Sequence, residues 1–330
     1  RNSLKDLVKK TVKKVFLPIT VGGGIKSIQN AADLLASGAD KIAVNTAIVE
    51  DNNLIDDLVN VFGAQCIVAS IQARNIGNDN WEVMTNSGRE KTGINVMDWI
   101  QEVQKRGVGE IFLTSIDNDG TCNGPDTNLL NTALPFCNVP LIFGGGYAKN
   151  STIYNSLNKT DVSGICLGAA LHYKKNSLPE IKNKLREKNV DLRYDSASRL
   201  NLSRKSLTGT MIGIIDYGMG NQHNLKNALE FLGAEVEITD NVYSLRKKDV
   251  LALPGVGAYP QGIKQLKDRN LDSFIKNMSL EGKPIIGICL GMQLLLESSE
   301  EFEYTNGLGL IRGHTKPLAS FCESNTKMPH

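Results

Sequence analysis

Long apolar runs are missing from this 330-residue sequence, and no stretch reaches the roughly 18 apolar residues that a membrane-spanning helix needs. Residues 1–6 read as the start of an amphipathic helix and lack the apolar region of a signal peptide. A strong charge of one sign is missing too, because 37 Lys and Arg residues face 35 Asp and Glu residues. No basic block with interleaved aromatic residues is present. We therefore expect neither a membrane nor a nucleic-acid partner.

Cysteine is sparse, and its six occurrences form no C-x-x-C pair. They are Cys66, Cys122, Cys137, Cys166, Cys289 and Cys322. Most lie in apolar stretches, which argues against a disulfide framework and against a zinc site. We expect reduced thiols in a cytoplasmic protein that binds no metal and uses no cofactor.

What the sequence does contain is a repeated alternation of short apolar runs with amphipathic stretches. The runs are residues 17–21, 41–44, 66–71, 111–116, 140–143 and 164–167. They lack the alternation of a half-exposed sheet, so we expect parallel strands that are covered on both faces. Residues 27–37 and 95–106 predict helices, and residues 81–85 predict a further short strand pair. Sustained alternation of this kind predicts a parallel α/β architecture.

The expected domains follow from this count of strands. Six βα units are two fewer than an eight-stranded (β/α)8 TIM barrel has. A helix predicted over residues 3–15 has no strand before it, so we expect an incomplete barrel over residues 1–193. Residues 194–210 hold four Ser and two Thr, which predicts a linker. Four apolar runs then predict a partial doubly wound domain over residues 211–330; they are residues 212–216, 236–238, 250–253 and 284–288. Met211 is either internal to a natural fusion or the first residue of a second gene.

Loops of small residues follow four strands of the first domain. They are residues 22–24, 45–46, 144–146 and 168–170. Backbone N–H groups in such loops can approach an anion closely, and barrel enzymes hold their sites at the carboxyl ends of the strands. The loops form two neighbouring pairs, which predicts two phosphate sites on opposite sides of one mouth. The alternative is that the glycines only form tight turns.

Two carboxylates, Asp117 and Asp119, directly follow the strand predicted over residues 111–116. Carboxylates at this end of a barrel strand can do acid/base work or orient a sugar hydroxyl. The alternative is a turn rich in Asp and Asn.

The pentapeptide Gly-Ile-Cys-Leu-Gly occurs twice, at residues 164–168 and 287–291. A G-x-C-x-G turn between a strand and a helix is typical of a nucleophile elbow, in which the helix start lowers the pKa of the thiol. A glycine loop at residues 255–257 follows a neighbouring strand and can stabilise an oxyanion. Cys166 has no such loop beside it. We therefore expect Cys289 to be the nucleophile and Cys166 to belong to the core or a turn.

The motifs together resemble imidazole glycerol phosphate synthase of histidine biosynthesis. They are Thr-Val-Gly-Gly-Gly at 20–24, Ala-Asp-Lys at 39–41, Gly-Glu-Ile at 109–111, Thr-Ser-Ile-Asp at 114–117, Asp-Tyr-Gly-Met-Gly-Asn at 216–221 and Pro-Gly-Val-Gly at 254–257. Residues 1–193 are similar to the cyclase subunit from its second helix onward. Residues 211–330 are similar to the first part of the glutaminase subunit, a class I glutamine amidotransferase.

The resemblance implies a function. The family hydrolyses glutamine and passes ammonia through the barrel to a ribulose-type bisphosphate nucleotide. The products are imidazole glycerol phosphate and an aminoimidazole carboxamide ribotide. Cleavage of glutamine would take place at Cys289, which forms a thioester.

The resemblance also implies roles for individual residues. Gly255, Val256 and Gly257 would form the oxyanion loop, and Gln293 would contact glutamine. The phosphate groups would bind Gly24, Asn45 and Thr46 on one side and Gly146, Ala169 and Ala170 on the other. Thr114, Gln72 and the catalytic Asp119 would line the mouth. Lys41 and Glu110 would form the gate through which ammonia enters the barrel.

The sequence departs from the family pattern in three ways. The family has a catalytic aspartate on its fifth strand, where this sequence reads Ile71-Gln72-Ala73, and an amide cannot act as an acid or base near neutral pH. The strand with the other catalytic aspartate is missing, and neither His314 nor His330 lies in the family's His-Pro-Glu context. The known fused enzymes place the glutaminase first. We therefore expect this stretch alone to be inactive in both half-reactions.

Three functions remain open at this stage. The first is the synthase of histidine biosynthesis. The second is a glutaminase and cyclase-like pair that supplies ammonia to a separate amidotransferase acting on a surface-polysaccharide sugar, which the loss of an aspartate at Gln72 favours. The third is a regulatory protein without enzymatic activity.

Overall fold

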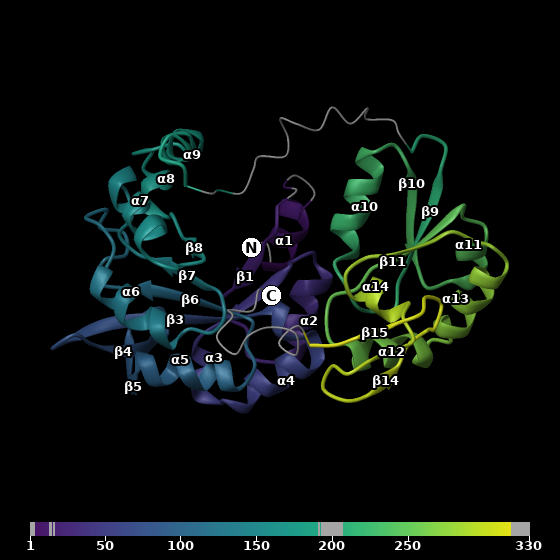
Figure 1. Cartoon of the computed structure of the whole chain (residues 1–330), viewed down its shortest axis with the longest axis horizontal. Coiled ribbons are helices and arrows are strands. Elements are labelled where there is room, and N and C mark those ends of the chain that lie inside the picture. The colour runs from purple at the N-terminus through teal and green to yellow at the C-terminus, as the bar shows by residue number, and fades with distance from the viewer. Residues whose placement is uncertain (1–3, 13–14, 16, 191, 193–206, 318–330) are drawn as a thin grey trace. The chain divides into compact units, whose positions relative to one another are not determined.

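The chain divides into two compact units in a computed structural model that describes residues 4–12, 15, 17–190, 192 and 207–317 (Figure 1). The first unit consists of Arg1–Ile42, Asp57–Cys66 and Leu200–Thr326, and the second of Ala43–Asp56, Ile67–Arg199 and Lys327–His330. These units do not follow the domain boundaries expected from the sequence, which stay a prediction. Most of the expected linker, residues 194–206, lies outside the described residues. Leu207, near its end, packs on the core of the second α/β sheet.

The larger sheet has the strand order β1-β2-β3-β6-β7-β8, and it confirms the expected half-barrel of about six strands. The strands are β1 (Thr20–Gly22), β2 (Lys41–Val44), β3 (Ile67–Gly77), β6 (Glu110–Ser115), β7 (Leu141–Gly144) and β8 (Gly164–Ile165). From β3 to β8 the neighbours pair in parallel, with Gln72 opposite Thr114 and Thr114 opposite Gly144. The carboxyl ends of these strands therefore share one edge.

The expectation that the strands of this sheet are covered on both faces holds only in part: β3 begins with three consecutive buried residues, and three of the four residues of β7 are buried. In β6 the residues alternate between half-buried and buried, and β2 shows the same alternation. Ile111 and Leu113 are fully buried, whereas Phe112 and Thr114 on the other face of β6 are only partly covered. The described sheet is open between β1 and β8, so its second face is not enclosed as it would be in a complete barrel.

The expected strand pair near residue 81 is a β-hairpin that extends the sheet. Strand β4 (Asn80–Thr85) pairs antiparallel with the long strand β3, and β5 (Glu90–Asn95) pairs antiparallel with β4. Asn78 and Asp79 join β3 to β4 with φ angles of 54° and 50°. Asn and Asp tolerate this left-handed conformation better than most residues, and two such residues form the turn that suits the twist of a hairpin.

The helices of this half follow the strands at the points that the sequence marks. They are α1 (Leu4–Val12), α2 (Ile28–Ala36), α3 (Thr46–Glu50), α4 (Asn53–Phe62), α5 (Val96–Lys105), α6 (Thr127–Ala133), α7 (Asn150–Lys159), α8 (Ala169–His172) and α9 (Leu178–Arg186), with short 3-10 turns at Ala64–Cys66 and Leu134–Phe136. Asn95 caps α5, because its side chain accepts hydrogen bonds from two backbone N–H groups of the first turn. The expected helices near residues 27–37 and 95–106 are present.

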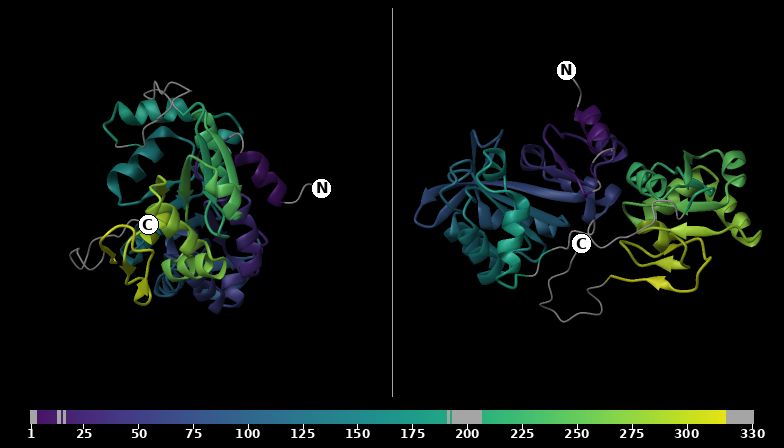
Figure 2. Two further views of the ribbon diagram at one scale, coloured as in Figure 1. Left: turned by 90° about the vertical axis from the view of Figure 1, so that its right-hand side faces the viewer. Right: turned by 90° about the horizontal axis from the view of Figure 1, so that it is seen from above.

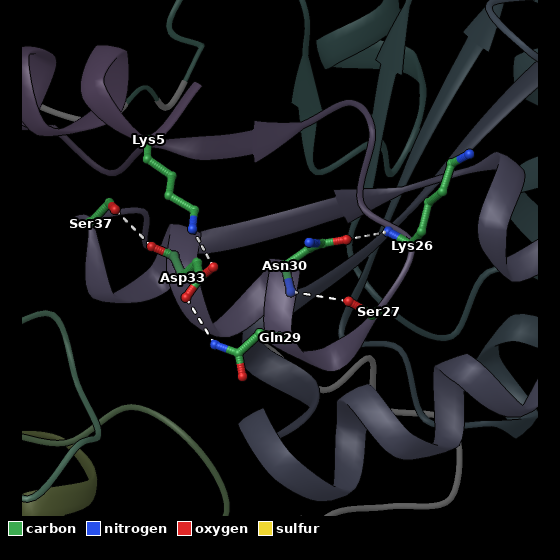
Figure 3. A network of polar contacts seen from close by, with 7 residues as sticks. All are labelled: Lys5, Lys26, Ser27, Gln29, Asn30, Asp33 and Ser37. Carbon is green, nitrogen blue, oxygen red and sulfur yellow. Dashed lines mark hydrogen bonds and ion pairs between the residues drawn. The ribbon is translucent and has the colours of Figure 1, made fainter. Parts of the chain in front are cut away.

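A polar network fixes α2 against α1 in the first unit (Figure 3). The Ser27 hydroxyl caps α2 by accepting from the backbone N–H of Asn30 at 3.2 Å. One turn later, Asp33 accepts hydrogen bonds from Lys5 of α1 and from Gln29. These two hydrogen bonds hold the pKa of Asp33 below its usual value. The network joins the two helices through Lys5 and Asp33, which lie 28 residues apart in the sequence.

The smaller sheet has the order β10-β9-β11-β12, and its strands are parallel, as the sequence predicts. The strands are β9 (Met211–Ile215), β10 (Glu235–Thr239), β11 (Val250–Leu253) and β12 (Ile285–Gly287). The helices are α10 (Gln222–Phe231), α11 (Val242–Arg246), α12 (Tyr259–Asp268), α13 (Leu271–Leu280) and α14 (Leu290–Leu294). Three short strands, β13 (Ser298–Ser299), β14 (Thr305–Asn306) and β15 (His314–Thr315), form a separate sheet.

Helices cover both faces of the smaller sheet. Leu225 and Leu229 of α10 pack on Ile212 and Ile214 of β9, and α10 lies beside the strands (Figure 2). Residues of α12, α13 and α14 join a second cluster with Ile215 of the same strand. This is the layered arrangement of a doubly wound domain. Among the described residues, no helix combines the length and the apolarity that crossing a membrane requires.

Candidate functional site

Cys289 lies between β12 and α14 in the conformation of a nucleophile elbow. Its φ and ψ angles are 54° and −120°, which side chains rarely adopt, and its thiol is exposed. The flanking glycines are required sterically. A Cβ atom on Gly287 would lie 2.6 Å from the Cα of Met292, and one on Gly291 would lie 1.8 Å from the carbonyl oxygen of Leu253. The strained turn therefore presents the thiol at the end of the strand.

The second copy of the pentapeptide lacks this geometry. A Cβ atom would meet nothing within 4 Å at Gly168 and nothing nearer than 3.6 Å at Gly164. Partial desolvation and the nearby carboxylate of Asp119 raise the pKa of the Cys166 thiol. Cys166 is exposed at the end of β8. It is therefore not a core residue, and only the alternative placement in a turn remains. Its thiol is not activated by its surroundings.

The glycine loop at residues 255–257 packs against the start of α14. A Cβ atom on Gly255 would lie 2.7 Å from the Cβ of Leu290 and 2.8 Å from the backbone nitrogen of Gly291. The buried hydroxyl of Tyr217 donates to the carbonyl of Pro254 at 2.7 Å and fixes the beginning of the loop. The structure thus brings Gly255 beside the Cys289 turn. That Gly255, Val256 and Gly257 form an oxyanion loop stays a prediction.

Gln293 lies in α14, one turn after Cys289. Its backbone N–H donates to the carbonyl of Cys289 at 3.2 Å, and its side chain is half-buried. This places it beside the nucleophile, where the sequence predicts contact with glutamine.

Two side chains of the first unit join the amidotransferase half to residues of the barrel half. Gln65 donates from Nε2 to the carbonyl of Gly257 at 3.2 Å. Asn221 donates from Nδ2 to the carbonyl of Gly38 and to Oδ1 of Asp40, both at 3.0 Å. The sequence analysis did not assign either side chain, because both contacts join residues more than 180 positions apart. The only sequence signal is that Asn221 ends the Asp-Tyr-Gly-Met-Gly-Asn motif.

Cys66 lies within electrostatic range of both Lys41 and Cys289 in this unit. Burial raises the pKa of the Cys66 thiol to about 12, a Cys289 thiolate adds to the rise, and the Lys41 ammonium opposes it. Lys41 is the first residue of β2, and Glu110 is the first residue of β6, so both predicted gate residues lie at strand starts. Their role as a gate stays a prediction.

In the second unit, the predicted phosphate-binding residue Asn45 lies close to two predicted mouth residues, Gln72 and Thr114. Asn45 donates from Nδ2 to Oε1 of Gln72 at 3.1 Å and to the carbonyl of Met84 at 3.2 Å. Gln72 is the register neighbour of Thr114. Oδ1 of Asn45 is buried and has no hydrogen-bond partner among the described residues. The adjacent Thr46 accepts from the backbone N–H of Asn86 at 3.0 Å.

Asp119 lies on the loop after β6, where its backbone N–H donates to the carbonyl of Ser115 at 3.0 Å. Its electrostatic effect on Cys166 places its carboxylate near the end of β8. Asp117 does not share this environment. Its Oδ2 accepts from the backbone N–H of Asn75 at 2.7 Å, so Asp117 ties the loop to β3. Of the two carboxylates, Asp119 is therefore the candidate for acid/base work.

The predicted phosphate loops are only partly assembled within one unit. Gly146 has a φ angle of 85°, and a Cβ atom there would lie 2.1 Å from the carbonyl oxygen of Gly124, so only glycine fits. Ala148, next to this loop, packs with Ala170 in one cluster, which brings the loops around Gly146 and Ala169 together. Gly24 has a φ angle of 70° and belongs to the first unit, whereas Asn45 and Thr46 belong to the second. Phosphate binding stays a prediction.

Comparisons with known proteins agree with this architecture. Residues 1–177 match a family model described as "Histidine biosynthesis protein", and residues 213–327 match one described as "Glutamine amidotransferase class-I". The chain is 42% identical over 195 residues to the imidazole glycerol phosphate synthase subunit HisF of Dictyoglomus thermophilum, an alignment that covers 59% of this chain and 77% of the relative. It is 45% identical to the subunit of the same name from Prochlorococcus marinus over 195 residues, 58% of this chain and 76% of that relative. The resemblance read from the motifs is confirmed, and the chain belongs to the histidine biosynthesis protein family, with a class I glutamine amidotransferase domain on the same chain.

Proposed function

We propose that this chain carries the active residues of an imidazole glycerol phosphate synthase. Glutamine is cleaved at Cys289, and the ammonia released enters the barrel at the end where Lys41 and Glu110 lie. It then reacts at the mouth with a bisphosphate ribulose-type nucleotide. The observation that carries the proposal is the strained Cys289 elbow within electrostatic range of Cys66, which directly precedes β3 and itself interacts with Lys41 at the start of β2.

The first half-reaction follows from the elbow. The Cys289 thiolate attacks the side-chain carbonyl carbon of glutamine, and the loop at Gly255–Gly257 stabilises the negative charge that forms on oxygen. Collapse of this intermediate breaks the carbon–nitrogen bond, and the nitrogen leaves as ammonia after it takes up a proton. Water then hydrolyses the thioester to glutamate and frees the thiol.

The second half-reaction belongs to the mouth. Asp119 is its carboxylate for proton transfer, and Asn45 and Thr114 lie where they can orient the nucleotide. Gln72 cannot transfer a proton, and its Oε1 is already occupied by Asn45. The loops around Gly24 and Gly146 hold the two phosphate groups in this proposal.

A second candidate function rests on Gln72 alone. An amide at this strand end fits a barrel that carries ammonia without catalysing cyclisation, and a separate amidotransferase would then place the ammonia on a surface-polysaccharide sugar.

A direct assay separates the two functions. The protein that contains this chain is supplied with the ribulose-type nucleotide and either glutamine or ammonium salt, and imidazole glycerol phosphate is measured. The synthase proposal expects product with both nitrogen sources and only with ammonium salt in Cys289→Ala. Glutamine hydrolysis without any product from either source would overturn it in favour of the second function.

A further inference from the structure

The loop after β6, residues 116–126, has to hold Asp119 at the mouth although it contains no helix or strand. An acid/base group works only when it is held within a fraction of an ångström of its productive place. The question is therefore which contacts fix the course of this loop. They all lie in the second unit, and they come from two sides.

On one side, the β6–α6 loop is hydrogen-bonded to the glycine loop at residues 144–146, which follows β7. Asn118 donates from Nδ2 to the carbonyl of Gly124 at 2.9 Å, which closes the loop on itself. The backbone N–H of Gly124 donates to the carbonyl of Gly146 at 2.9 Å. Any displacement of residues 118–124 therefore also moves the backbone that is proposed to bind phosphate.

On the other side, the β3–β4 hairpin holds both ends of the loop. Asp117 accepts from the backbone N–H of Asn75 at 2.7 Å, as described above. At the far end, Oδ2 of Asp126 accepts from the indole Nε1 of Trp81 at 3.0 Å. A third contact, Asn128 to Asp79 at 3.1 Å, is exposed.

The contact between Trp81 and Asp126 is the one built into the core. Trp81 is 1% exposed and lies in β4 opposite Asn75, so its ring is fixed by the sheet. Asp126 uses both of its oxygens: Oδ1 accepts from the backbone N–H of Leu129 and caps α6, and Oδ2 accepts from Trp81. A carboxylate held by two donors from different elements has a fixed orientation, and hydrogen bonds to charged groups are the stronger ones.

We propose that Trp81 and Asp126 are positioning residues, whose hydrogen bond sets the course of the β6–α6 loop and thereby places Asp119 for the cyclase reaction. Neither residue touches the reacting atoms in this proposal, which rests on the function proposed above. The indole fills a buried site in β4 and supplies one N–H to Asp126.

Two variants and one matched control test the proposal. Trp81→Phe removes the donor and keeps an aromatic ring, and Asp126→Asn keeps an oxygen for the α6 cap but turns an amide toward the indole N–H. Trp99→Phe is the control, because Trp99 is equally buried and its Nε1 has no hydrogen-bond partner among the described residues. We expect the first two variants to lower kcat of ammonia-dependent cyclisation about ten- to hundredfold with KM nearly unchanged. Trp99→Phe should retain the wild-type kcat.

The double variant and a structural readout make the outcome decisive. If the two residues act through one hydrogen bond, the double variant is no slower than the slower single variant. A kcat for Trp81→Phe equal to that of Trp99→Phe would overturn the proposal, as would losses that multiply in the double variant.

Hydrogen exchange tests the role of Trp81 and Asp126 independently of activity. If the wild-type protein forms no product, the proposed function fails, but this test of the loop can still be made. The Asp119 amide should then exchange faster in Trp81→Phe than in Trp99→Phe, and equal rates would overturn the loop assignment.

Discussion

At the scale of single residues, the two copies of Gly-Ile-Cys-Leu-Gly show what separates a nucleophile elbow from an ordinary turn. Around Cys289, a Cβ atom on either flanking glycine would overlap neighbouring backbone atoms, so only glycine fits. Around Cys166, a Cβ atom on either flanking glycine would meet no atom nearer than 3.6 Å. The two pentapeptides have the same sequence. The difference therefore comes from β11 and α14, which pack on the turn at Cys289 but not on the turn at Cys166.

This contrast gives a matched pair of substitutions. Gly291→Ala should destabilise the protein by about 3 kcal/mol, because the new methyl group would overlap the carbonyl of Leu253 and force the elbow to shift. Gly168→Ala, in the other copy, should change the free energy of unfolding by less than about 0.5 kcal/mol. Urea unfolding followed by circular dichroism measures both. A Gly291→Ala protein as stable as Gly168→Ala would show that the elbow does not have the tight packing described here.

Gln72 leads to a second prediction about single residues. Gln72→Asp should raise the rate of cyclisation about a hundredfold, because it restores a carboxylate for proton transfer at the strand end while an oxygen still faces Asn45. Gln72→Asn is the control, since it has the length of Asp and the chemistry of Gln. Equal rates for the two variants would indicate that this strand end takes no part in proton transfer and would favour the ammonia-supplying function.

At the scale of elements, the contribution of the Lys5–Asp33 contact between α1 and α2 to stability depends on pH, because Asp33 titrates. Its pKa is lowered by Lys5 and Gln29, so its contribution to stability is present above the usual value near 3.8 and disappears as the pH falls through the lowered value. Asp33→Asn should therefore have a lower melting temperature than the wild type at pH 7. The difference should vanish once the pH falls below the lowered pKa of Asp33, and it should shrink in high salt because the pair is exposed. Glu50→Gln, which removes an exposed carboxylate at the end of α3, is the control. A difference that persists at low pH would contradict this account.

The elements also show how far the sequence alone could predict this protein. Strand starts and ends were predicted within a few residues wherever glycine or small residues follow an apolar run, as at Val44 and Gly144. The extension of β3 to Gly77 was not predicted, because Ile76 is the only large apolar residue among residues 74–77 and their partner is the hairpin strand β4. The residue types of the site were predicted from motifs. The contacts of Gln72 with Asn45, and of Asp126 with Trp81, were not, because they depend on tertiary packing between distant segments.

At the scale of the whole molecule, one chain carries a barrel domain of the cyclase family and a glutamine amidotransferase domain, and the first compact unit contains residues of both. Tethering two modules on one chain raises their effective concentration, so a small set of contacts is enough to keep them together. Asn221 and Asn227 make such contacts with residues of the barrel half. Asn221 bonds to Gly38 and Asp40, and Asn227 donates to the carbonyl of Val12 at 3.1 Å.

The two asparagines make a test of ammonia transfer within the protein that contains this chain. Asn221 is the last residue of the motif at 216–221 and contacts Asp40, the residue before Lys41, whereas Asn227 lies farther along α10. If ammonia passes from Cys289 to the barrel near Lys41, Asn221→Ala should lower glutamine-dependent cyclisation about tenfold and leave ammonia-dependent cyclisation unchanged, because loss of the two hydrogen bonds loosens this passage. Asn227→Ala should change the ratio of the two rates by less than twofold. Equal losses in both rates for Asn221→Ala would instead mean that Asn221 supports the barrel itself, and unchanged rates would remove Asn221 from the path of ammonia.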